Sequence, residues 1–159
     1  MAPKALIPLS GISTLTARLR RSGRKIVFTN GVFDIIHRGH VDYLAKARSF
    51  GDLLIVGLNT DASVRRLKGK GRPVQPQSDR AAILLALRSV DYVVLFADDT
   101  PARLIEKVRP DVLVKGADYA LSDIVGAKFV KSYGGSVKRV RLVKGRSTSA
   151  LVRLLGGQS

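Results

Sequence analysis

Short apolar runs alternate with helix-like segments along the whole chain. Four runs predict buried strands, at residues 26–29, 53–58, 92–96 and 112–115. Apolar residues recur at helical spacing in other segments, at residues 11–22, 40–49, 61–67, 78–88, 124–133 and 147–155. Residues 137–143 alternate basic and apolar positions, as an edge strand with one wet face does. The pattern predicts an α/β fold with a Rossmann-like, parallel, five-stranded sheet and helices on both faces.

Capping and turn residues suggest where these elements begin. Ser78 and Ser147 are suited to cap the helices that follow them, and Thr100 precedes a proline suited to the first helical position. Residues 68–77 combine charges, glycines and prolines, which predicts a mobile functional loop. We expect a single nucleotidyltransferase domain over residues 24–159, preceded by an N-terminal helical extension over residues 1–23.

Composition narrows the class of protein only slightly. The 28 Lys and Arg against 12 Asp and Glu give a net charge of +16, which favours anionic partners such as phosphorylated metabolites. The positive residues are scattered rather than grouped, so a solvated basic surface is an equal interpretation and a nucleic-acid partner is not favoured. The absence of cysteine excludes disulfides and thiolate chemistry and suits the cytoplasm. No apolar run reaches the roughly 18–20 residues of a transmembrane helix, so no membrane partner is expected.

The segment after the first predicted strand carries the chemistry. His37 and His40 are the two histidines of the chain, and they lie where a helix begins, with Gly39 allowing close approach. Such a helix start is suited to bind the phosphate oxygens of a nucleotide. Its structural alternative is a helix start that a histidine caps. A zinc site formed with Asp34 lacks a fourth ligand, so no metal site is predicted from protein side chains.

These residues resemble a known family. The sequence from Thr29 to His40 contains the His-x-Gly-His signature of the cytidylyltransferase-like nucleotidyltransferases. Further segments follow in the order found in the adenylyltransferase domains of the bacterial ADP-heptose synthesis family, at residues 58–74, 89–94, 98–101, 110–119 and 145–149. The resemblance covers about residues 24–155.

The resemblance implies transfer of AMP from ATP to D-glycero-β-D-manno-heptose 1-phosphate. The products would be pyrophosphate and ADP-heptose, which feeds the lipopolysaccharide inner core. We expect Mg²⁺ on ATP, held largely by phosphates and water. In many bacteria this domain is fused to a heptose-phosphate kinase. With about 24 residues before the domain, the chain is expected to be the stand-alone form, with a separate kinase supplying its substrate.

The site residues follow from the resemblance and from residue chemistry. His37 and His40 are expected to be catalytic, through contacts with phosphate oxygens. The residues expected to bind nucleotide or phosphate are Thr29, Asn30, Gly31, Phe33, Gly39, Lys46, Lys115, Gly116, Asp118, Arg146, Ser147, Thr148 and Ser149. The residues expected to bind the acceptor are Asp34, Asp61, Lys68, Arg72 and Arg80. The two carboxylates suit sugar hydroxyls or metal-bound water, because they would repel phosphate. A solvated surface position is the alternative for four of the cations, Lys46, Lys68, Arg72 and Arg80. An ordinary turn at a strand end is the alternative for residues 115–118, and an ordinary helix cap is the alternative for Ser147.

Other functions remain open on the sequence alone. The same fold would serve a cytidylyltransferase or an adenylyltransferase with another phosphorylated acceptor, and composition does not separate ATP from CTP. A basic, non-catalytic RNA-binding domain is the alternative from a different class, and it predicts steeply salt-dependent binding. A homo-oligomer is expected, because relatives are commonly dimers or larger and an exposed edge strand would permit pairing.

Overall fold

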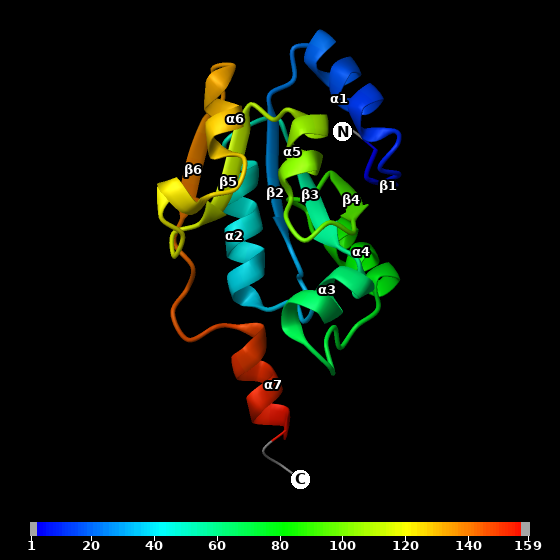
Figure 1. Ribbon diagram of the computed structural model, residues 1–159, viewed down its shortest axis with the longest axis vertical. Coiled ribbons are helices and arrows are strands. Elements are labelled where there is room, and N and C mark those ends of the chain that lie inside the picture. Colours follow the sequence, from blue (N-terminus) through cyan, green and yellow to red (C-terminus); the bar gives the residue numbers. More distant parts are fainter. Residues whose placement is uncertain (1–2, 157–159) are drawn as a thin grey trace.

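A parallel sheet of six strands organises the computed structural model, which describes residues 3–156 (Figure 1). The strands lie in the order β1-β4-β3-β2-β5-β6. Their bounds are β1 (Ala5–Ile7), β2 (Ile26–Gly31), β3 (Leu53–Asn59), β4 (Tyr92–Phe96), β5 (Val112–Gly116) and β6 (Ser136–Val140). The predicted Rossmann-like architecture is confirmed, with one strand more than the five expected.

The order of the strands creates a crevice beside β2. From β2 the chain adds β3 and then β4 on one side, and it returns to place β5 and β6 on the other. The direction of growth therefore reverses between β2 and β5. In open parallel sheets, the loops that leave the two strands at such a point diverge and leave room for a ligand at the carboxyl ends.

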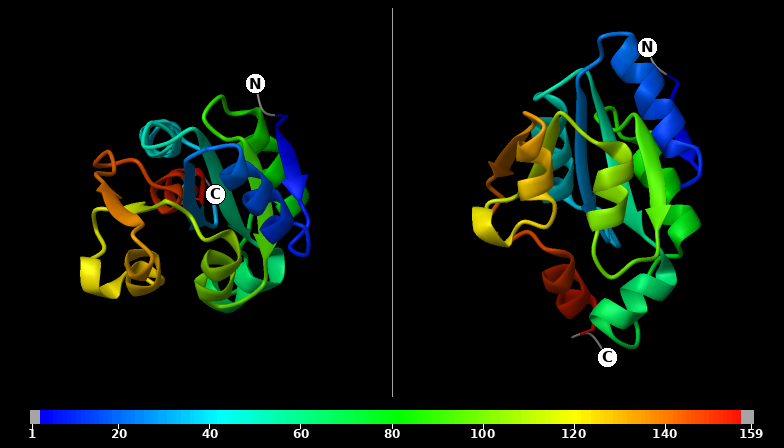
Figure 2. Two further views of the ribbon diagram at one scale, coloured as in Figure 1. Left: turned by 90° about the horizontal axis from the view of Figure 1, so that it is seen from above. Right: turned by 45° about the horizontal axis from the view of Figure 1, so that its top comes forward.

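Helices cover both faces of the sheet. The core on one face includes residues of α1 (Ile12–Arg21), α5 (Ala102–Val108) and α6 (Ala127–Ser132). The opposite core includes residues of α2 (Arg38–Arg48) and α4 (Gln77–Ala86). Figure 2 shows α2 and the α5–α6 pair on opposite sides of the sheet. The remaining helices are α3 (Asp61–Lys68), a 3-10 turn at Leu121–Asp123, and α7 (Thr148–Gly156), which projects from the body (Figure 1).

The N-terminal segment is integral to this domain. Residues 5–7 pair in parallel with β4 and supply the sixth strand. In α1, Ile12, Leu15 and Leu19 recur at helical spacing and are buried in the core, while the last turn is basic. Residues 5–21 thus contribute to the sheet and its core rather than forming an appended helix. The outermost ends of the two predicted segments, residues 1–2 and 157–159, lie outside the described residues.

Several boundaries differ from the predicted ones. The helix expected at residues 78–88 begins one residue earlier, with Pro76 at its N-cap, so Ser78 is not the cap. The predicted helix at 124–133 is the shorter α6, preceded by the 3-10 turn. The edge strand ends at Val140 rather than at residue 143. Ser147 precedes α7 as predicted, and its hydroxyl accepts a hydrogen bond from the amide of Ala150 at 3.1 Å.

Candidate active site

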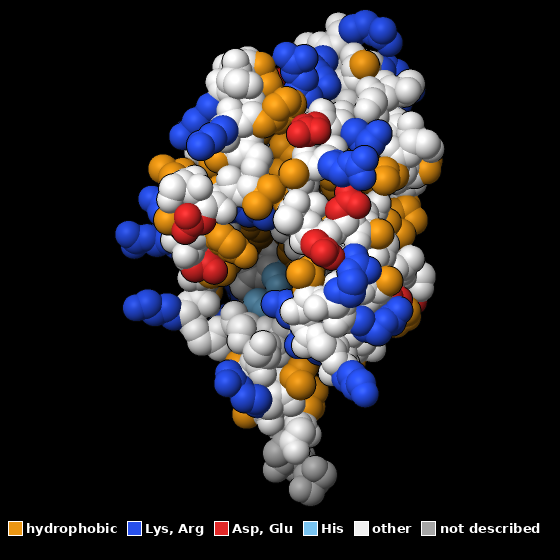
Figure 3. All heavy atoms as spheres, in the orientation of Figure 1, with side chains coloured by type: hydrophobic (Ala, Val, Ile, Leu, Met, Phe, Trp, Pro, Cys, Tyr) orange, Lys and Arg blue, Asp and Glu red, His pale blue; other side chains and the backbone are white. Residues whose placement is uncertain are grey.

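A cavity of about 640 Å³ opens at the carboxyl ends of the strands, at the crevice beside β2. Figure 3 shows this hollow, with imidazole side chains inside it and Lys and Arg side chains around it. Most of the predicted site residues line it, namely Asn30, Gly31, Phe33, Asp34, His37, Gly39, His40, Lys68, Arg72, Lys115, Gly116, Asp118, Arg146, Ser147, Thr148 and Ser149.

Both histidines are fixed by the first turn of α2. The Nδ1 atom of His37, the N-cap residue, accepts a hydrogen bond from the amide of Gly39 at 3.1 Å. The Nδ1 atom of His40 faces the amide of His37 at 3.4 Å, a longer contact that completes a reciprocal capping box. The capping role considered from sequence is therefore real. Because Nδ1 is the acceptor, Nε2 carries the hydrogen in each neutral ring and is the atom available to a ligand.

The surroundings of the rings keep them neutral. The two imidazoles stack with their centroids 3.8 Å apart. Burial, and then the charge of neighbouring His37, lower the pKa of His40 to about 4. Burial and the charge of Arg146 lower the pKa of His37 as well. At neutral pH the pair consequently offers two N–H donors without positive charge.

Glycine at two positions lets the backbone and the rings come close. A Cβ on Gly39 would lie 2.9 Å from the ring of His37. A Cβ on Gly31 would lie 2.9 Å from the ring of Phe33, whose own φ of 45° lies in the left-handed region. That ring meets the imidazole of His40 edge-on, with centroids 5.3 Å apart. Larger side chains at either glycine would displace the aromatic rings that shape this part of the cavity.

A half-buried lysine lies at the end of β5. The ammonium group of Lys115 donates a hydrogen bond to the side-chain oxygen of Asn30, across the β2–β5 crevice. Burial lowers the pKa of Lys115 to about 8, against the opposing effect of Asp118. A Cβ on Gly116 would lie 2.4 Å from the carboxylate of Asp118, an exposed side chain that would have to move aside. An anion entering the cavity would meet an ammonium group that the fold has already partly removed from water.

Four predicted site residues do not line the cavity. The hydroxyl of Thr29 is buried and donates to the carbonyl of Val114 at 2.9 Å. Lys46 is exposed and packs over the ring of Phe50, 5.3 Å from its centroid. Asp61 and Arg80 form an ion pair with each other, at 2.6 Å. Thr29, Lys46, Asp61 and Arg80 are therefore placed away from the ligand space by the fold.

Asp34 borders the cavity, but its carboxylate is enclosed. It accepts hydrogen bonds from Arg72 Nε and from the amides of Val74 and Gln75, at 2.8–2.9 Å. The side chain has no exposed surface. To contact a sugar hydroxyl or metal-bound water, this carboxylate would have to lose its partners in the loop between α3 and α4. This arrangement contradicts the acceptor-binding role predicted for Asp34 from the sequence.

The cavity also includes residues that the sequence did not single out. They come mainly from the ends of β3 and β4 and from the segment after β5, and include Tyr43, Asn59, Phe96, Asp99, Thr100, Pro101, Tyr119 and Leu142. Their position after the end of a parallel strand was an available signal for several of them. Tyr43 gave no such signal, since only packing brings its hydroxyl to within 2.8 Å of the hydroxyl of Thr29.

The described part of the chain offers no cage for a metal ion. Within residues 3–156, no group of three or more His, Asp or Glu side chains is placed to hold one. The zinc alternative is also disfavoured by geometry, because both Nδ1 atoms and the carboxylate of Asp34 already have partners. Among the same residues, no helix has the length and apolar character needed to cross a membrane.

Comparison with known proteins decides the family. The profile for cytidylyltransferase-like proteins matches residues 28–149. The chain belongs to the cytidylyltransferase-like family. This match runs from β2 to the start of α7 and includes both histidines, so the resemblance inferred from the sequence motifs is confirmed.

Individual relatives agree with this assignment. The chain is 56% identical to the bifunctional protein HldE of Geobacter sulfurreducens over 144 residues, which are 91% of this chain and 29% of the relative. It is 60% identical to the HldE of Pseudomonas paraeruginosa over 133 residues, 84% and 28% of the two chains. The chain thus spans less than a third of these relatives. A solved structure, the lipopolysaccharide core biosynthesis protein from Thermoplasma volcanium, aligns with a TM-score of 0.61 and 31% identity, over 78% of this chain and all of that one.

Proposed function

We propose that this cytidylyltransferase-like protein is a nucleotidyltransferase that moves AMP from ATP to D-glycero-β-D-manno-heptose 1-phosphate. The products are ADP-heptose, a precursor of the lipopolysaccharide inner core, and pyrophosphate. The observation that carries the proposal is the pair of neutral imidazoles at the helix start, inside a cavity with basic side chains. High identity to HldE proteins and the likeness to a lipopolysaccharide core biosynthesis protein support the choice of substrate.

The reaction requires positioning more than acid–base chemistry. A phosphate oxygen of the acceptor, already an anion, attacks the α-phosphorus of ATP and forms the new P–O bond. The bond from the α-phosphorus to the bridging oxygen breaks, and pyrophosphate leaves with that electron pair. The protein must therefore hold two polyanions in line and stabilise charge that builds on the α-phosphate and the leaving group.

The arrangement of side chains suits that task. His37 and His40 donate Nε2–H groups to phosphate oxygens at the centre of the cavity, where two neutral donors do not require a buried positive charge. Lys115 at the end of β5, Arg146 in the segment before α7 and Arg72 in the loop before α4 all line the cavity. We assign the nucleotide to Lys115 and Arg146, and the acceptor phosphate to Arg72.

A divalent cation, proposed to be Mg²⁺, fits this cavity as a companion of ATP. Asp99, Asp118 and Asp123 are among the lining residues, but they form no metal-holding group within the described part of the chain. The donor set therefore suits a cation held mainly by triphosphate oxygens and water. When bound, the cation would neutralise phosphate charge.

The first test is pyrophosphate release with Mg²⁺, heptose 1-phosphate and either ATP or CTP. We expect turnover with ATP that depends on the sugar phosphate. Turnover with CTP alone would reassign the donor while keeping the fold and chemistry. If neither nucleotide gives pyrophosphate release and the protein binds RNA with a steep salt dependence, the RNA-binding alternative would replace this proposal.

The catalytic assignment is tested by His40→Ala. Loss of one preorganised donor at the transition state is expected to lower kcat about 10²- to 10³-fold. The circular dichroism spectrum should remain that of the parent, because His40 supplies only the longer contact of the capping box. A variant that folds and keeps full activity would remove His40 from the mechanism.

The proposal extends to the setting of the enzyme. We propose a cytoplasmic homo-oligomer whose sugar phosphate comes from a separate kinase. Strand β6 is the last strand of the sheet order, with Lys138 and Arg139 exposed on it, so pairing through this edge must accommodate their charge. Light scattering at several ionic strengths measures the oligomeric state, and a monomer at all of them would reject this part.

A further inference from the structure

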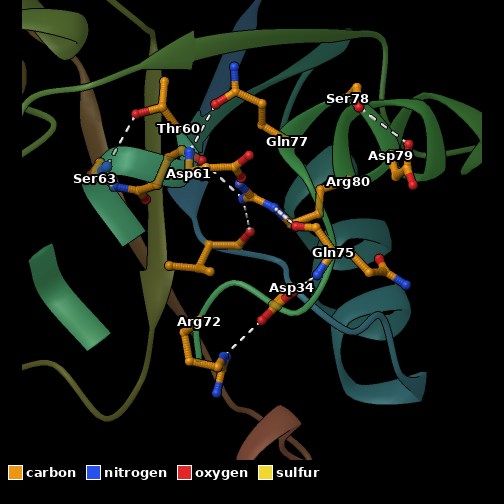
Figure 4. Close-up of polar contacts among 12 residues, drawn as sticks. Asp34, Thr60, Asp61, Ser63, Arg72, Gln75, Gln77, Ser78, Asp79 and Arg80 are labelled. Carbon is orange, nitrogen blue, oxygen red and sulfur yellow. Dashed lines mark hydrogen bonds and ion pairs between the residues drawn. The ribbon is translucent and has the colours of Figure 1, made fainter. Parts of the chain in front are cut away.

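The loop between α3 and α4, called the flap here (residues 69–76), is fastened to the body of the protein by Asp34. The carboxylate of Asp34 accepts hydrogen bonds from the flap amides of Val74 and Gln75 and from Arg72 Nε. Figure 4 shows Asp34 between Arg72 and Gln75, with the Arg72 contact dashed. A segment that its glycines and prolines predict to be mobile is thereby held against the loop that follows β2.

Arg80 makes a second anchor for the same flap. Its side chain has no exposed surface and forms the ion pair with Asp61. The guanidinium also donates to three backbone carbonyls at 2.8–3.0 Å, those of Val32 after β2, Asn59 at the end of β3, and Gln75 in the flap. A buried cation with this many acceptors joins three chain segments and has little capacity left for a substrate.

The electrostatics of Asp34 agree with an anchoring role. Burial raises the pKa of Asp34, but the two flap amides and Arg72 outweigh it, so the net pKa lies below its usual value. The carboxylate is therefore charged at neutral pH and its negative charge is balanced by donors from the flap. It supplies no free carboxylate edge for a sugar.

Arg72 has a different position from the other members of this cluster. Its Nε–H is directed to Asp34, its side chain is 19% exposed, and it lines the cavity. A guanidinium has five N–H donors, and the bond to Asp34 uses the one on Nε. Its two terminal amino groups are thus the ones available to an anion.

We infer that Asp34 is a positioning residue that orients Arg72 as a ligand for the acceptor phosphate, with Arg80 as the second anchor of the flap. The identity of that phosphate rests on the proposed function, whereas the fastening of the flap does not. The flap contains Gly69 and Gly71, both with positive φ, so ordering it is costly in conformational entropy. Asp34 causes that ordering to occur during folding, which leaves less of the cost to binding.

The test compares Asp34→Asn with Asp42→Asn. Both replace a carboxylate that pairs with an arginine, but the Arg38–Asp42 pair is exposed and Asp42 does not line the cavity. Amide hydrogen exchange of residues 69–76, measured without substrate, should accelerate in Asp34→Asn and stay at the parental rate in Asp42→Asn. Because no substrate is present, this readout stands whether or not the proposed reaction is correct.

Steady-state kinetics supply the second readout. Asp34→Asn is expected to raise the KM for the acceptor about tenfold or more, while the KM for ATP changes less than about twofold. Arg72→Lys keeps the positive charge but lacks the Nε–H donor, so it should raise the same KM. This second variant keeps the test decisive if Asp34→Asn fails to fold. The double variant should be little worse than the worse single variant, because both act through one contact.

Two results would overturn the inference. One is parental flap exchange in a folded Asp34→Asn variant, which would show that the carboxylate does not fasten the flap. The other is an equal rise in KM for ATP and acceptor, or independent effects of the two substitutions, which would show that Asp34 does not act through Arg72. Failure of the proposed function alone would appear differently, as accelerated flap exchange without turnover of heptose 1-phosphate.

Discussion

Two basic parts of the cavity lining, called walls here, are built in opposite ways: the flap with Arg72, and residues 141–156 with Arg146. Arg72 stands on a flap that the buried groups of Asp34 and Arg80 hold in place. Arg146 stands in a stretch whose residues 141–147 are all exposed, followed by α7, a helix with no buried residue. The hydroxyl of Thr148, at the start of α7, connects this second wall to the body of the protein by donating a hydrogen bond to the carbonyl of Ile35 at 3.1 Å.

This difference separates stability from ligand binding. Asp34 and Arg80, the groups behind the flap, are charged, buried and hydrogen-bonded to protein atoms, so their loss should affect folding strongly. Groups on the α7 wall face solvent, so their loss should affect folding little, whatever they do for a nucleotide. Because the α7 wall has few buried groups, little free energy is needed to shift it, and a bound ligand can determine its position.

The largest expected effect comes from Arg80→Met on the flap side. The substitution leaves Asp61 and the carbonyls that Arg80 now satisfies without their donor, and we expect a loss of about 3–5 kcal/mol in the free energy of unfolding. Arg66→Met is the matched control, because Arg66 pairs with Asp99 at the surface and is half exposed. Its loss should stay below about 1 kcal/mol. Urea unfolding measures both, and equal losses would contradict the claim that the buried charge behind the flap carries the stability.

An intermediate effect is expected from acid at the histidines between the walls. The pKa of a histidine in the unfolded chain is about 6.5, whereas burial and neighbouring His37 lower the pKa of His40 in the folded protein to about 4. Between these values the unfolded chain binds a proton that the folded one does not, so the free energy of unfolding falls as pH drops from 6.5 to 4. Burial raises the pKa of Asp34, but its hydrogen bonds from Gln75, Val74 and Arg72 lower it overall, so the flap anchor is not the group expected to take up this proton.

His40→Gln isolates that contribution. Glutamine does not titrate, so stability should decline less between about pH 6.5 and pH 4 in the variant than in the parent. Urea unfolding at about pH 7, 5.5 and 4.5 gives the comparison. Parallel declines in the two proteins would assign the acid sensitivity to other groups.

The smallest effect is expected on α7. Leu154 and Leu155 are 71% and 74% exposed, so replacing both with glutamate should change the free energy of unfolding by no more than about 0.5 kcal/mol. Thermal unfolding at low protein concentration measures this for the single chain. A drop of several kcal/mol would show that α7 packs against something in solution, and the contrast between the walls would then be wrong.

Patterns with a short range in the sequence were predicted well. The strand at 53–58 was predicted correctly because its buried positions carry apolar side chains or glycine; in the structure the strand continues to Asn59, which is polar and also buried. His37 and His40 are brought together by one helical turn, so their spacing alone places both rings on the same side. By contrast, β1 has three residues and lies between two prolines, and its strand conformation depends on pairing with β4, far along the chain.

Burial of charge was the feature that sequence reasoning missed. Arg80 looks like a surface cation of a helix start, since nothing near it in sequence reports the carbonyls of Val32 and Asn59. Asp34 looks like a free carboxylate for the same reason, because its partners are some forty residues away. Lys46 has suitable charge and helical spacing, yet it packs over Phe50 on the outer surface.

The sequence by itself determined the class of fold, the family and the histidine pair at the start of α2, because each depends on periodicity or on residues within a turn of one another. The tertiary structure alone decided which charged groups meet a ligand and which hold the flap. That choice depends on desolvation and on hydrogen-bond partners contributed by distant strand ends, and these exist only once β2, β3 and the flap have come together.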